Sequence, residues 1–509
     1  MAKALDFGKI SFDVQPGSDP ATEIQSRPFR ILILGDFSGQ GENQGPLAGR
    51  RPCLVDRDNF DDVLKKLRPA LTVPLGEARV DIHFEGIDDF HPDRLFERVV
   101  LFQKLRELRE RMSNASTFPE AAAELGLAPR RDAPGNAAET EPPRAADAAQ
   151  MVARNLLEDA ISATEGQSAG LVRPQRPGDL ASFIQRAVAP HLTARPDPRQ
   201  AEWVGIIDQT AAAQMRALLH LPAFKALEAA WRAVFFLVRR IETDAALKIY
   251  LLDVGKGELT RDLGLAENAD KMRLETLVVD EAAGMPGGEP WALIAGNYTF
   301  HRTLEDLTLL RSLERIAHEA SAPFVADAGP DLVGCASPAD LAEPRKWNAA
   351  DDSNEDRAWQ ALRRSPEASY LGLVIPRFLL RLPYGNETDP AERFEFEEIM
   401  GAPDHDDYLW GNSVCLCITA LADEFAAHGW EMQPGHSHDT GGLPLHVYRR
   451  DGEAVAAPCA EVSLTNDAAE RILDAGLMPV VPLRGQDVVR LVRLQSIADP
   501  LRGLSGRWR

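Results

Sequence analysis

The chain has 509 residues, and 56 Lys and Arg against 78 Asp and Glu give it a formal net charge of −22. This balance argues against nucleic acid as a partner, because neutralising phosphates requires a basic face. No apolar run reaches the roughly 18 residues of a membrane span, and the start MAKALDFGKISFDV lacks the apolar core of a secretory signal. We therefore expect neither membrane insertion nor export.

Five scattered cysteines are too few for a disulfide scaffold, and an odd number cannot all pair. Cys415 and Cys417 lie in the apolar run VCLCITAL, where we expect two small buried side chains. A reducing, cytoplasmic location is the expectation. The length suggests about three domains at roughly 100–200 residues each.

The first 127 residues predict strands followed by a helix. Residues 9–15 alternate apolar and polar as in a half-buried strand, 29–34 form an apolar run typical of a strand buried on both faces, and 78–87 alternate again. A single helix is expected over 90–112, because Leu95, Val99, Phe102 and Leu105 recur at helical spacing.

The sharpest change of composition is at 128–150, an Ala/Pro/Glu-rich stretch with no aliphatic or aromatic side chain larger than Ala. Such a stretch cannot bury enough surface to fold, so we interpret it as a linker. The predicted organisation is a small domain at 1–127, the linker, a helical segment at 151–200 and α/β domains at 201–509.

Beyond the linker, strands and helices alternate. A short amphipathic helix is expected at 155–163, and a longer helix runs from 211 to 241 with an interruption near Pro222. Further strands are predicted at 247–254, 291–300, 322–328, 368–385, 443–450 and 478–484, and a helix at 304–320. The alternation predicts a mixed α/β (α+β) fold with helices packed on sheets.

The loop GDFSGQGENQG (35–45) follows an apolar strand, as a dinucleotide loop would. Its spacing at Gly39, Gly41 and Gly45 is one residue too long for the Rossmann fingerprint, and no helix opens after it. No P-loop motif occurs in the chain. A glycine-rich surface loop is the interpretation we adopt.

The histidine-rich stretch 436–446 contains His436, His438, Asp439 and His446, which could in principle ligate zinc. The spacing matches no closed metal site, and an exposed loop explains it better. Acidic runs at 394–400 and 404–408 are expected in so acidic a chain. No catalytic motif is present, so the sequence predicts no catalytic residue, metal or cofactor.

Several blocks in order resemble the large sheath subunit (TssC) of the bacterial type VI secretion system over roughly 150–500. They include ALLHLPAFKALEAAWRAVFFLV (217–238), LKIYLLDVGKGELTRDL (247–263), YLGLVIPRFLLRLPYGNETDPAERFEFEE, YLWGNSVCLCITALADEFAAHGW and LDAGLMPVVPLRGQDVVRLVRLQSIADP. In the first part, ISFDVQ, PFRILILGDFSG and FEGIDDFHPDRLFERVVLFQKLRELRERM resemble the small sheath subunit (TssB). The chain thus resembles a fusion of the two subunits, joined at 128–150.

The resemblance implies a structural protomer. In the family, small and large subunits form six-fold rings that stack into a helical cytoplasmic sheath around a tube of haemolysin-coregulated protein, assembled with a baseplate. Contraction expels the tube, and a Clp-type AAA+ ATPase then disassembles the sheath. The family's ATPase-binding helix corresponds here to NLLEDAISATE, and the role is carried onto Leu156, Leu157, Asp159 and Ile161. An ordinary amphipathic helix is the alternative for this segment.

Five other residues are candidates for core or interface roles. Glu228 and Arg232 are four positions apart on a helix and can pair, while Trp231 is a large core anchor. Arg377 and Arg381 flank Phe378-Leu379-Leu380, and either reach acidic partners or snorkel at the core edge.

The predicted strands at 9–15 and 478–484 could add to the sheet edge of a neighbouring protomer. In the family, interlaced strands keep protomers connected.

The fusion restricts the chain ends that are exchanged elsewhere, so a specialised sheath segment is also possible. Two other functions remain open: a sheath of a related contractile injection particle, and a soluble α/β enzyme using the 35–45 loop or the 436–446 histidines.

Overall fold

The computed structural model describes residues 27–41, 47–75, 78–125, 199–266, 272–283, 288–348 and 352–508. The predictions for 9–15, 128–150 and 155–163 fall outside these residues. Within them, no helix has the length and apolar character needed to cross a membrane.

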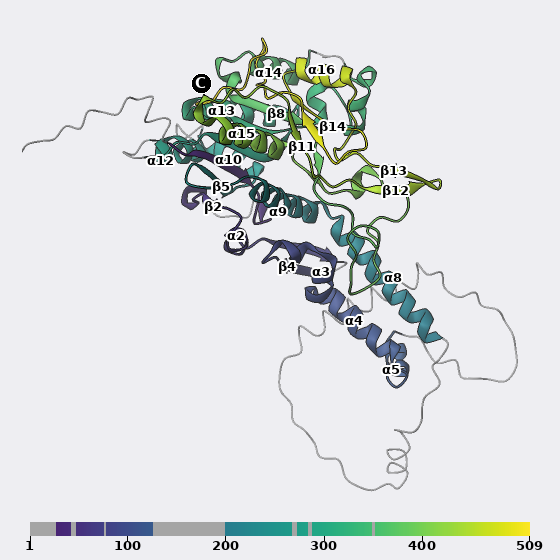
Figure 1. Cartoon of the computed structure of the whole chain (residues 1–509). Helices are drawn as coiled ribbons and strands as arrows, with labels where there is room; N and C mark the ends of the chain where they lie inside the picture. The colour runs from purple at the N-terminus through teal and green to yellow at the C-terminus, as the bar shows by residue number, and fades with distance from the viewer. Residues whose placement is uncertain are drawn as a thin grey trace, which may run out of the picture.

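A nine-stranded sheet forms the centre of the fold (Figure 1). Its strands, in spatial order, are β11 (His438–Thr440), β15 (Val489–Leu491), β14 (Met478–Pro482), β8 (Leu371–Ile375), β7 (Phe324–Ala328), β6 (Leu293–Phe300), β1 (Phe29–Gly35), β5 (Leu247–Asp253) and β2 (Cys53–Val55). The six strands from β14 to β5 are parallel, whereas β11, β15 and β2 run antiparallel to their neighbours. The expected mixed α/β fold is confirmed.

The side chains of strand β1 are buried on both faces of the sheet. Phe29, Ile31 and Ile33 belong to one buried cluster, and Leu32 and Leu34 belong to the other. Successive strand residues point to opposite faces, so both faces of β1 are buried, as its continuous apolar sequence predicts.

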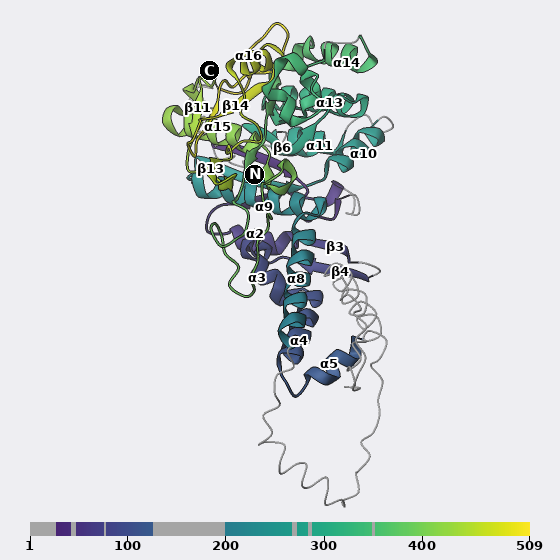
Figure 2. The ribbon, with the colours of Figure 1, turned by 90° about the vertical axis from the view of Figure 1, so that its right-hand side faces the viewer.

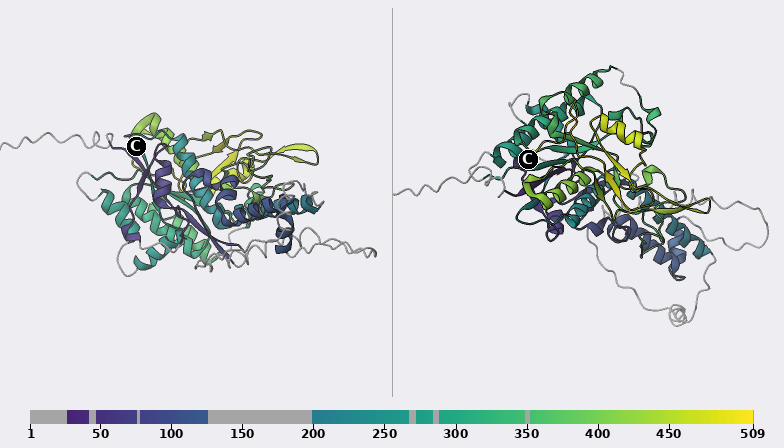
Figure 3. Two further views of the ribbon diagram at one scale, coloured as in Figure 1. Left: turned by 90° about the horizontal axis from the view of Figure 1, so that it is seen from below. Right: turned by 45° about the horizontal axis from the view of Figure 1, so that its top comes forward.

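Two sets of helices provide this cover. The face of Ile31 packs with α2 (Phe60–Leu67), α9 (Pro222–Arg240) and α15 (Val414–His428). The face of Leu32 packs with α10 (Lys256–Ala266), α11 (Arg273–Glu275), α13 (Leu304–Ala320), α14 (Asn354–Arg363) and α16 (Asn466–Asp474). A short α12 (Glu281–Ala283) also lies in this part of the chain. Figure 3 shows the purple N-terminal segments lying against teal and green segments from much later in the sequence.

Helix boundaries follow local signals in the sequence. α13 spans the predicted 304–320, with the Thr303 side chain accepting from the Asp306 N–H at 3.2 Å and Ser321 ending it in the left-handed region at φ 50°. The predicted interruption near Pro222 is confirmed, because α8 (Arg199–Leu219) ends there and Pro222 begins α9.

The single helix expected over 90–112 is wrong. The structure has α3 (Pro92–Arg98) and α4 (Val100–Ser113), separated by Val99 in an extended conformation (φ −76°, ψ 125°). The Gln103 side-chain amide donates to the carbonyls of Glu97 (2.9 Å) and Arg98 (3.3 Å), which satisfies acceptors at the end of α3. The apolar residues keep their helical spacing across Val99, so the sequence pattern does not reveal that the helix is interrupted there.

An arm extends from the sheet and combines both parts of the chain (Figure 2). It contains α4, α5 (Phe118–Glu124) and α8, and α4 packs along α8. Arg109 of α4 pairs with Asp208 of α8 at 2.6 Å, and the buried Gln200 amide donates to the Met112 carbonyl at 3.2 Å. These contacts join residues on opposite sides of the 128–150 stretch.

Three small antiparallel pairs complete the described structure. They are β3 (Ala70–Leu75) with β4 (Ala78–His83), β9 (Phe378–Leu379) with β10 (Trp410–Gly411), and β12 (Val447–Arg450) with β13 (Glu453–Ala456). The prediction that 478–484 could add to the sheet edge of a neighbouring protomer is wrong for this structure, since β14 lies between β8 and β15 and both of its edges are hydrogen-bonded within the chain. The edges of the described sheet are β11 and β2.

Candidate functional site

Arg381 forms a buried ion cluster with carboxylates from two distant parts of the chain. Its Nε lies 2.7 Å from Oε1 of Glu228 on α9, and its Nη1 and Nη2 lie 2.7 and 3.0 Å from the two carboxylate oxygens of Glu398. Glu228 is fully buried, and Arg381 and Glu398 are 7% and 2% exposed. The cluster therefore fastens α9 to the segment after β9.

Arg232 and Tyr384 extend this cluster. Arg232 Nε lies 2.7 Å from Oε1 of Glu228, the pairing expected from their helical spacing, and Arg232 Nη2 donates to the Tyr384 hydroxyl at 2.8 Å. The Arg381 guanidinium stacks 4.1 Å from the centre of the Tyr384 ring. Burial alone would raise the pKa of Glu398, but the charge of Arg381 and several hydrogen bonds lower that pKa to about 2.

Arg377 forms a separate pair with Glu461. Its Nε donates to Glu461 Oε1 at 3.1 Å, its Nη2 makes a second contact, and His405 Nε2 lies 2.8 Å from the same oxygen. Burial opposes ionisation of Glu461, yet His405 and Arg377 lower its pKa to about 2. The bond to Glu461 in turn raises the pKa of His405. Both arginines thus reach acidic partners, and those partners lie within the same chain.

Trp231 anchors the join between the two parts of the sequence. It is fully buried, its indole Nε1 donates to the Phe37 carbonyl at 2.8 Å, and its ring meets Phe37 and Phe60 edge-on. Trp231 of α9 therefore packs on the loop that follows β1.

That loop is folded by Asp36. Its carboxylate accepts from the backbone N–H groups of Gly39 at 2.9 Å and Gly41 at 3.0 Å. Gly39 has φ 69°, and a Cβ there would lie 2.9 Å from the Ala70 carbonyl oxygen, so only glycine fits. Burial, reinforced by Asp253, raises the pKa of Asp36.

Asp327 is a buried carboxylate that the sequence analysis missed. It is 1% exposed at β7, and its carboxylate accepts from the N–H groups of Ser413 and Val414, both at 2.8 Å, at the start of α15. Burial raises its pKa to about 8 despite these bonds. An aspartate inside the apolar stretch APFVADA was the available signal. Glu398 and Glu461, also missed, gave no comparable signal.

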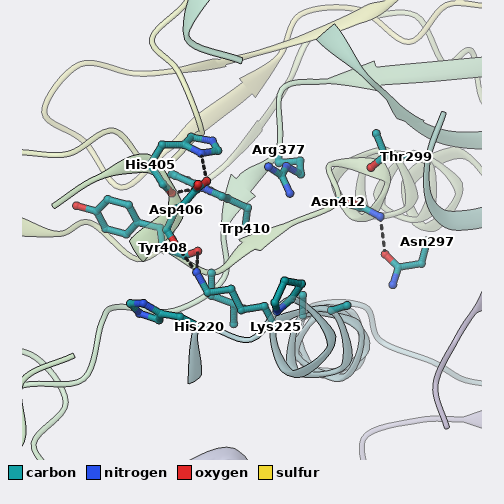
Figure 4. A pocket seen from close by; sticks show the side chains of 14 residues that line it. His220, Lys225, Asn297, Thr299, Arg377, His405, Asp406, Tyr408, Trp410 and Asn412 are labelled. Carbon is teal, nitrogen blue, oxygen red and sulfur yellow. Dashed lines mark hydrogen bonds and ion pairs between the residues drawn. The ribbon is translucent and has the colours of Figure 1, made fainter. Parts of the chain in front are cut away.

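A cavity lies beside these groups, between α9 and the segment before α15 (Figure 4). It has a volume of about 550 Å³. Its polar lining residues are His220, Lys225, Asn297, Thr299, Arg377, His405, Asp406 and Asn412. Tyr408 and Trp410 complete one wall, and alanines of α9 form part of another.

The histidines of 436–446 do not form a common site. His438 on β11 lies 3.3 Å from Asp423, whereas His446 is buried and shares a 2.8 Å hydrogen bond with the Tyr408 hydroxyl. Asp439 pairs with Arg490 at 2.6 Å, and His436 is exposed. Across the described ranges, no group of three or more potential metal ligands comes together.

The cysteine prediction holds, since all five thiols are free and buried. Cys415 and Cys417 lie on α15, and burial raises the pKa of both. The proposed ATPase-binding residues Leu156, Leu157, Asp159 and Ile161 lie outside the described residues.

The polar clusters therefore tie together distant elements of one α/β core. Residues 201–498 match the family "EvpB/VC_A0108, tail sheath N-terminal domain", and residues 9–118 match the family "Type VI secretion system, VipA, VC_A0107 or Hcp2". The chain belongs to the type VI secretion sheath family and joins its two subunit types in one polypeptide.

Two curated relatives come from Pseudomonas aeruginosa strain PAO1. The type VI secretion system sheath protein TssC1 is 32% identical over 303 residues, which are 58% of this chain and 61% of that protein. The sheath protein TssB1 is 33% identical over 119 residues, which are 22% of this chain and 67% of that protein. The chain thus spans about three fifths of TssC1 and two thirds of TssB1.

Proposed function

We propose that this chain is a protomer of a type VI secretion sheath that contains both subunit types, and that it acts without catalysis. Copies assemble into six-fold rings, the rings stack into a helical sheath around a tube of haemolysin-coregulated protein, and contraction expels the tube. One observation carries the proposal: β1, from the part that matches the small subunit, lies between β5 and β6 of the part that matches the large one.

The remaining partners follow from the family. The sheath is cytoplasmic, starts from a baseplate, and is disassembled after contraction by a Clp-type AAA+ ATPase that binds Leu156, Leu157, Asp159 and Ile161. Charged groups that meet across protomers are drawn from the exposed surface, because Arg377 and Arg381 already have partners within the chain.

Electron microscopy of the purified full-length chain tests the sheath role, alone and with its tube protein. We expect cylinders with six-fold symmetry that lengthen or become more numerous when the tube protein is present. Monomers under every condition would overturn the proposal. Sheath-like particles that assemble on a different tube and are released from cells would support the injection-particle alternative.

Deletion of residues 155–165 tests the ATPase-binding role. We expect sheaths to assemble and contract normally but to persist after contraction, since the ATPase has lost its contact. Deletion of residues 133–143 is the matched control, because it removes the same length from the linker. Equal disassembly rates in the two deletion variants would reject the assignment.

A further inference from the structure

The 550 Å³ cavity lies where open α/β sheets commonly bind ligands. β5 lies on one side of β1, while β6, β7 and β8 follow on the other, so the order of the strands reverses around β1. Ligands in such sheets bind beyond the carboxyl ends of the strands near this reversal. Asn297 and Thr299 in the C-terminal half of β6, and Arg377 just after β8, line the cavity at that edge.

Lys225 supplies a cation without a carboxylate partner. Its Nζ donates to the backbone carbonyls of Asp406 and of Tyr408, the latter at 3.3 Å, and no carboxylate in the described chain forms an ion pair with it. An ammonium has three N–H donors, so one remains available. Partial burial lowers the pKa of Lys225, and the more distant charges of Glu398, Asp406 and Asp407 oppose this shift without reversing it.

Histidine and arginine side chains lie around Lys225 at this end of the cavity, together with the carboxylate of Asp406. Figure 4 shows His220 and His405 at the same end as Lys225, with Arg377 between that end and the other. Glu461 balances the charge of Arg377, and Asp406, the acidic residue of the lining, has a 99% exposed side chain that contacts His405. Among the lysine and arginine of this lining, Lys225 is therefore the one without a carboxylate in direct contact within the described chain.

The opposite end of the cavity is neutral and rich in hydrogen-bonding groups. Asn412 Nδ2 donates to Asn297 Oδ1 at 3.0 Å, which leaves the Asn297 amide nitrogen and the Thr299 hydroxyl without a partner in the described part of the chain. Between the two ends, Trp410 and the alanines at 226 and 229 provide an apolar wall.

An adjacent cavity of about 330 Å³ shares Ala226 and Asn297 but contains the carboxylates of Asp36 and Glu258. Lys256 also lines this cavity but is paired with Asp306 at 2.9 Å, and Glu258 is paired with Arg50 at 2.6 Å. The larger cavity is therefore the better anion site, because its Lys225 has no carboxylate in direct contact within the described chain.

We propose that the larger cavity binds a small phosphorylated molecule. The phosphate lies at the Lys225 end, where it accepts a charge-assisted hydrogen bond from the remaining ammonium N–H, and the rest of the ligand extends along Trp410 toward Asn297 and Thr299. The volume falls within the roughly 300–1,000 Å³ typical of small-molecule sites. This inference goes beyond the sheath role and does not depend on it.

Isothermal titration of the full-length chain with AMP, adenosine, glycerol 3-phosphate, pyrophosphate and citrate tests the proposal. We expect a phosphorylated probe to bind and adenosine to bind at least about tenfold more weakly than AMP. Failure of all three phosphorylated probes, or binding of citrate alone, would overturn it.

Two variants place the ligand in this cavity. Lys225→Met removes the cation, and Ala226→Asp adds a carboxylate at an exposed helix position beside it without removing a contact. Each should weaken the phosphorylated probe at least about tenfold. Ala201→Asp, at an exposed position in the first turn of α8, is the matched control and should leave affinity unchanged. Equal affinity in Ala226→Asp and Ala201→Asp would show that the ligand binds elsewhere.

Discussion

The buried cluster around Arg381 holds two buried carboxylates against one guanidinium group. Arg381→Met should leave the carboxylates of Glu228 and Glu398 buried without their shared cation, and removal of one partner from a buried pair costs about 3–5 kcal/mol. We expect a loss of that size in the free energy of unfolding, measured by urea denaturation of the unassembled chain.

Arg490→Met is the control for this change. Arg490 pairs with Asp439 at 2.6 Å, but both side chains are nearly half exposed, at 45% and 44%. Water screens exposed ion pairs and weakens their contribution, so this variant should unfold almost like the parent chain. Similar losses in both variants would show that the Arg381 cluster is no more important than a surface pair.

Glu314 on α13 makes stability depend on pH. It is 1% exposed, its Oε2 has no hydrogen-bond partner in the described structure, and burial raises its pKa from 4.5 to about 7. The folded state therefore binds more protons than the unfolded state between these values, so this residue lowers stability as pH rises from 4.5 to about 7.

Glu314→Gln keeps the shape of the side chain and removes this titration. The variant should gain up to ~3 kcal/mol over the parent chain at pH 8 and little at pH 4, because one pKa unit corresponds to about 1.4 kcal/mol. Urea denaturation between pH 4 and pH 8 measures the difference, with exposed Glu305→Gln on the same helix as control. Parallel pH curves for Glu314→Gln and the parent chain would contradict this prediction.

Whether the sequence predicts a buried ion pair depends on how far apart the two partners lie along the chain. Glu228 and Arg232 could be paired from sequence because helical geometry places positions i and i+4 together. Arg381 could not be assigned to Glu228, because their meeting depends on how α9 packs against the segment after β9. The ATPase-binding residues remain a prediction.

At the scale of elements, whether a segment forms a helix or a strand was easier to predict than where that element lies in the fold. β1, β5 and α13 follow from apolar runs, alternation and capping residues within each segment. The break at Val99 and the internal position of β14 were missed, because both are set by contacts with other segments.

Two glycines in regular elements should respond oppositely to alanine. A Cβ at Gly296 in β6 would lie 2.7 Å from Phe324 Cζ and 2.8 Å from Tyr298 Cδ2, so Gly296→Ala should overpack the core and cost about 1–3 kcal/mol. A Cβ at Gly205 in α8 would meet nothing within 4 Å, so Gly205→Ala should stabilise the helix by about 0.5–1 kcal/mol.

Thermal unfolding of both glycine variants measures this contrast. Each variant is the control for the other, because both replace glycine by alanine and only the surroundings of the two glycines differ. A lower melting temperature for Gly205→Ala, or an unchanged one for Gly296→Ala, would contradict the described packing of α8 or β6.

At the scale of the whole molecule, the two family segments share one core. β1 pairs with β5 along its whole length and with β6 over four residues, and α4 packs along α8. The sequence indicated where the two segments join, but not that the first would supply a central strand to the second. That placement depends on pairing between residues more than 200 positions apart, which no local pattern reveals.

The shared sheet predicts the behaviour of a divided chain. Residues 1–139 and 140–509, produced together, should purify as a one-to-one complex, because the second fragment alone would lack the strand between β5 and β6. Ile33→Asp in the first fragment should abolish the complex, since Ile33 is 3% exposed and a buried carboxylate is strongly unfavourable. Leu54→Asp, at a 43% exposed position of β2, is the matched control and should leave the complex intact. Size-exclusion chromatography measures both outcomes, and fragments that each fold alone and elute separately would contradict a common core.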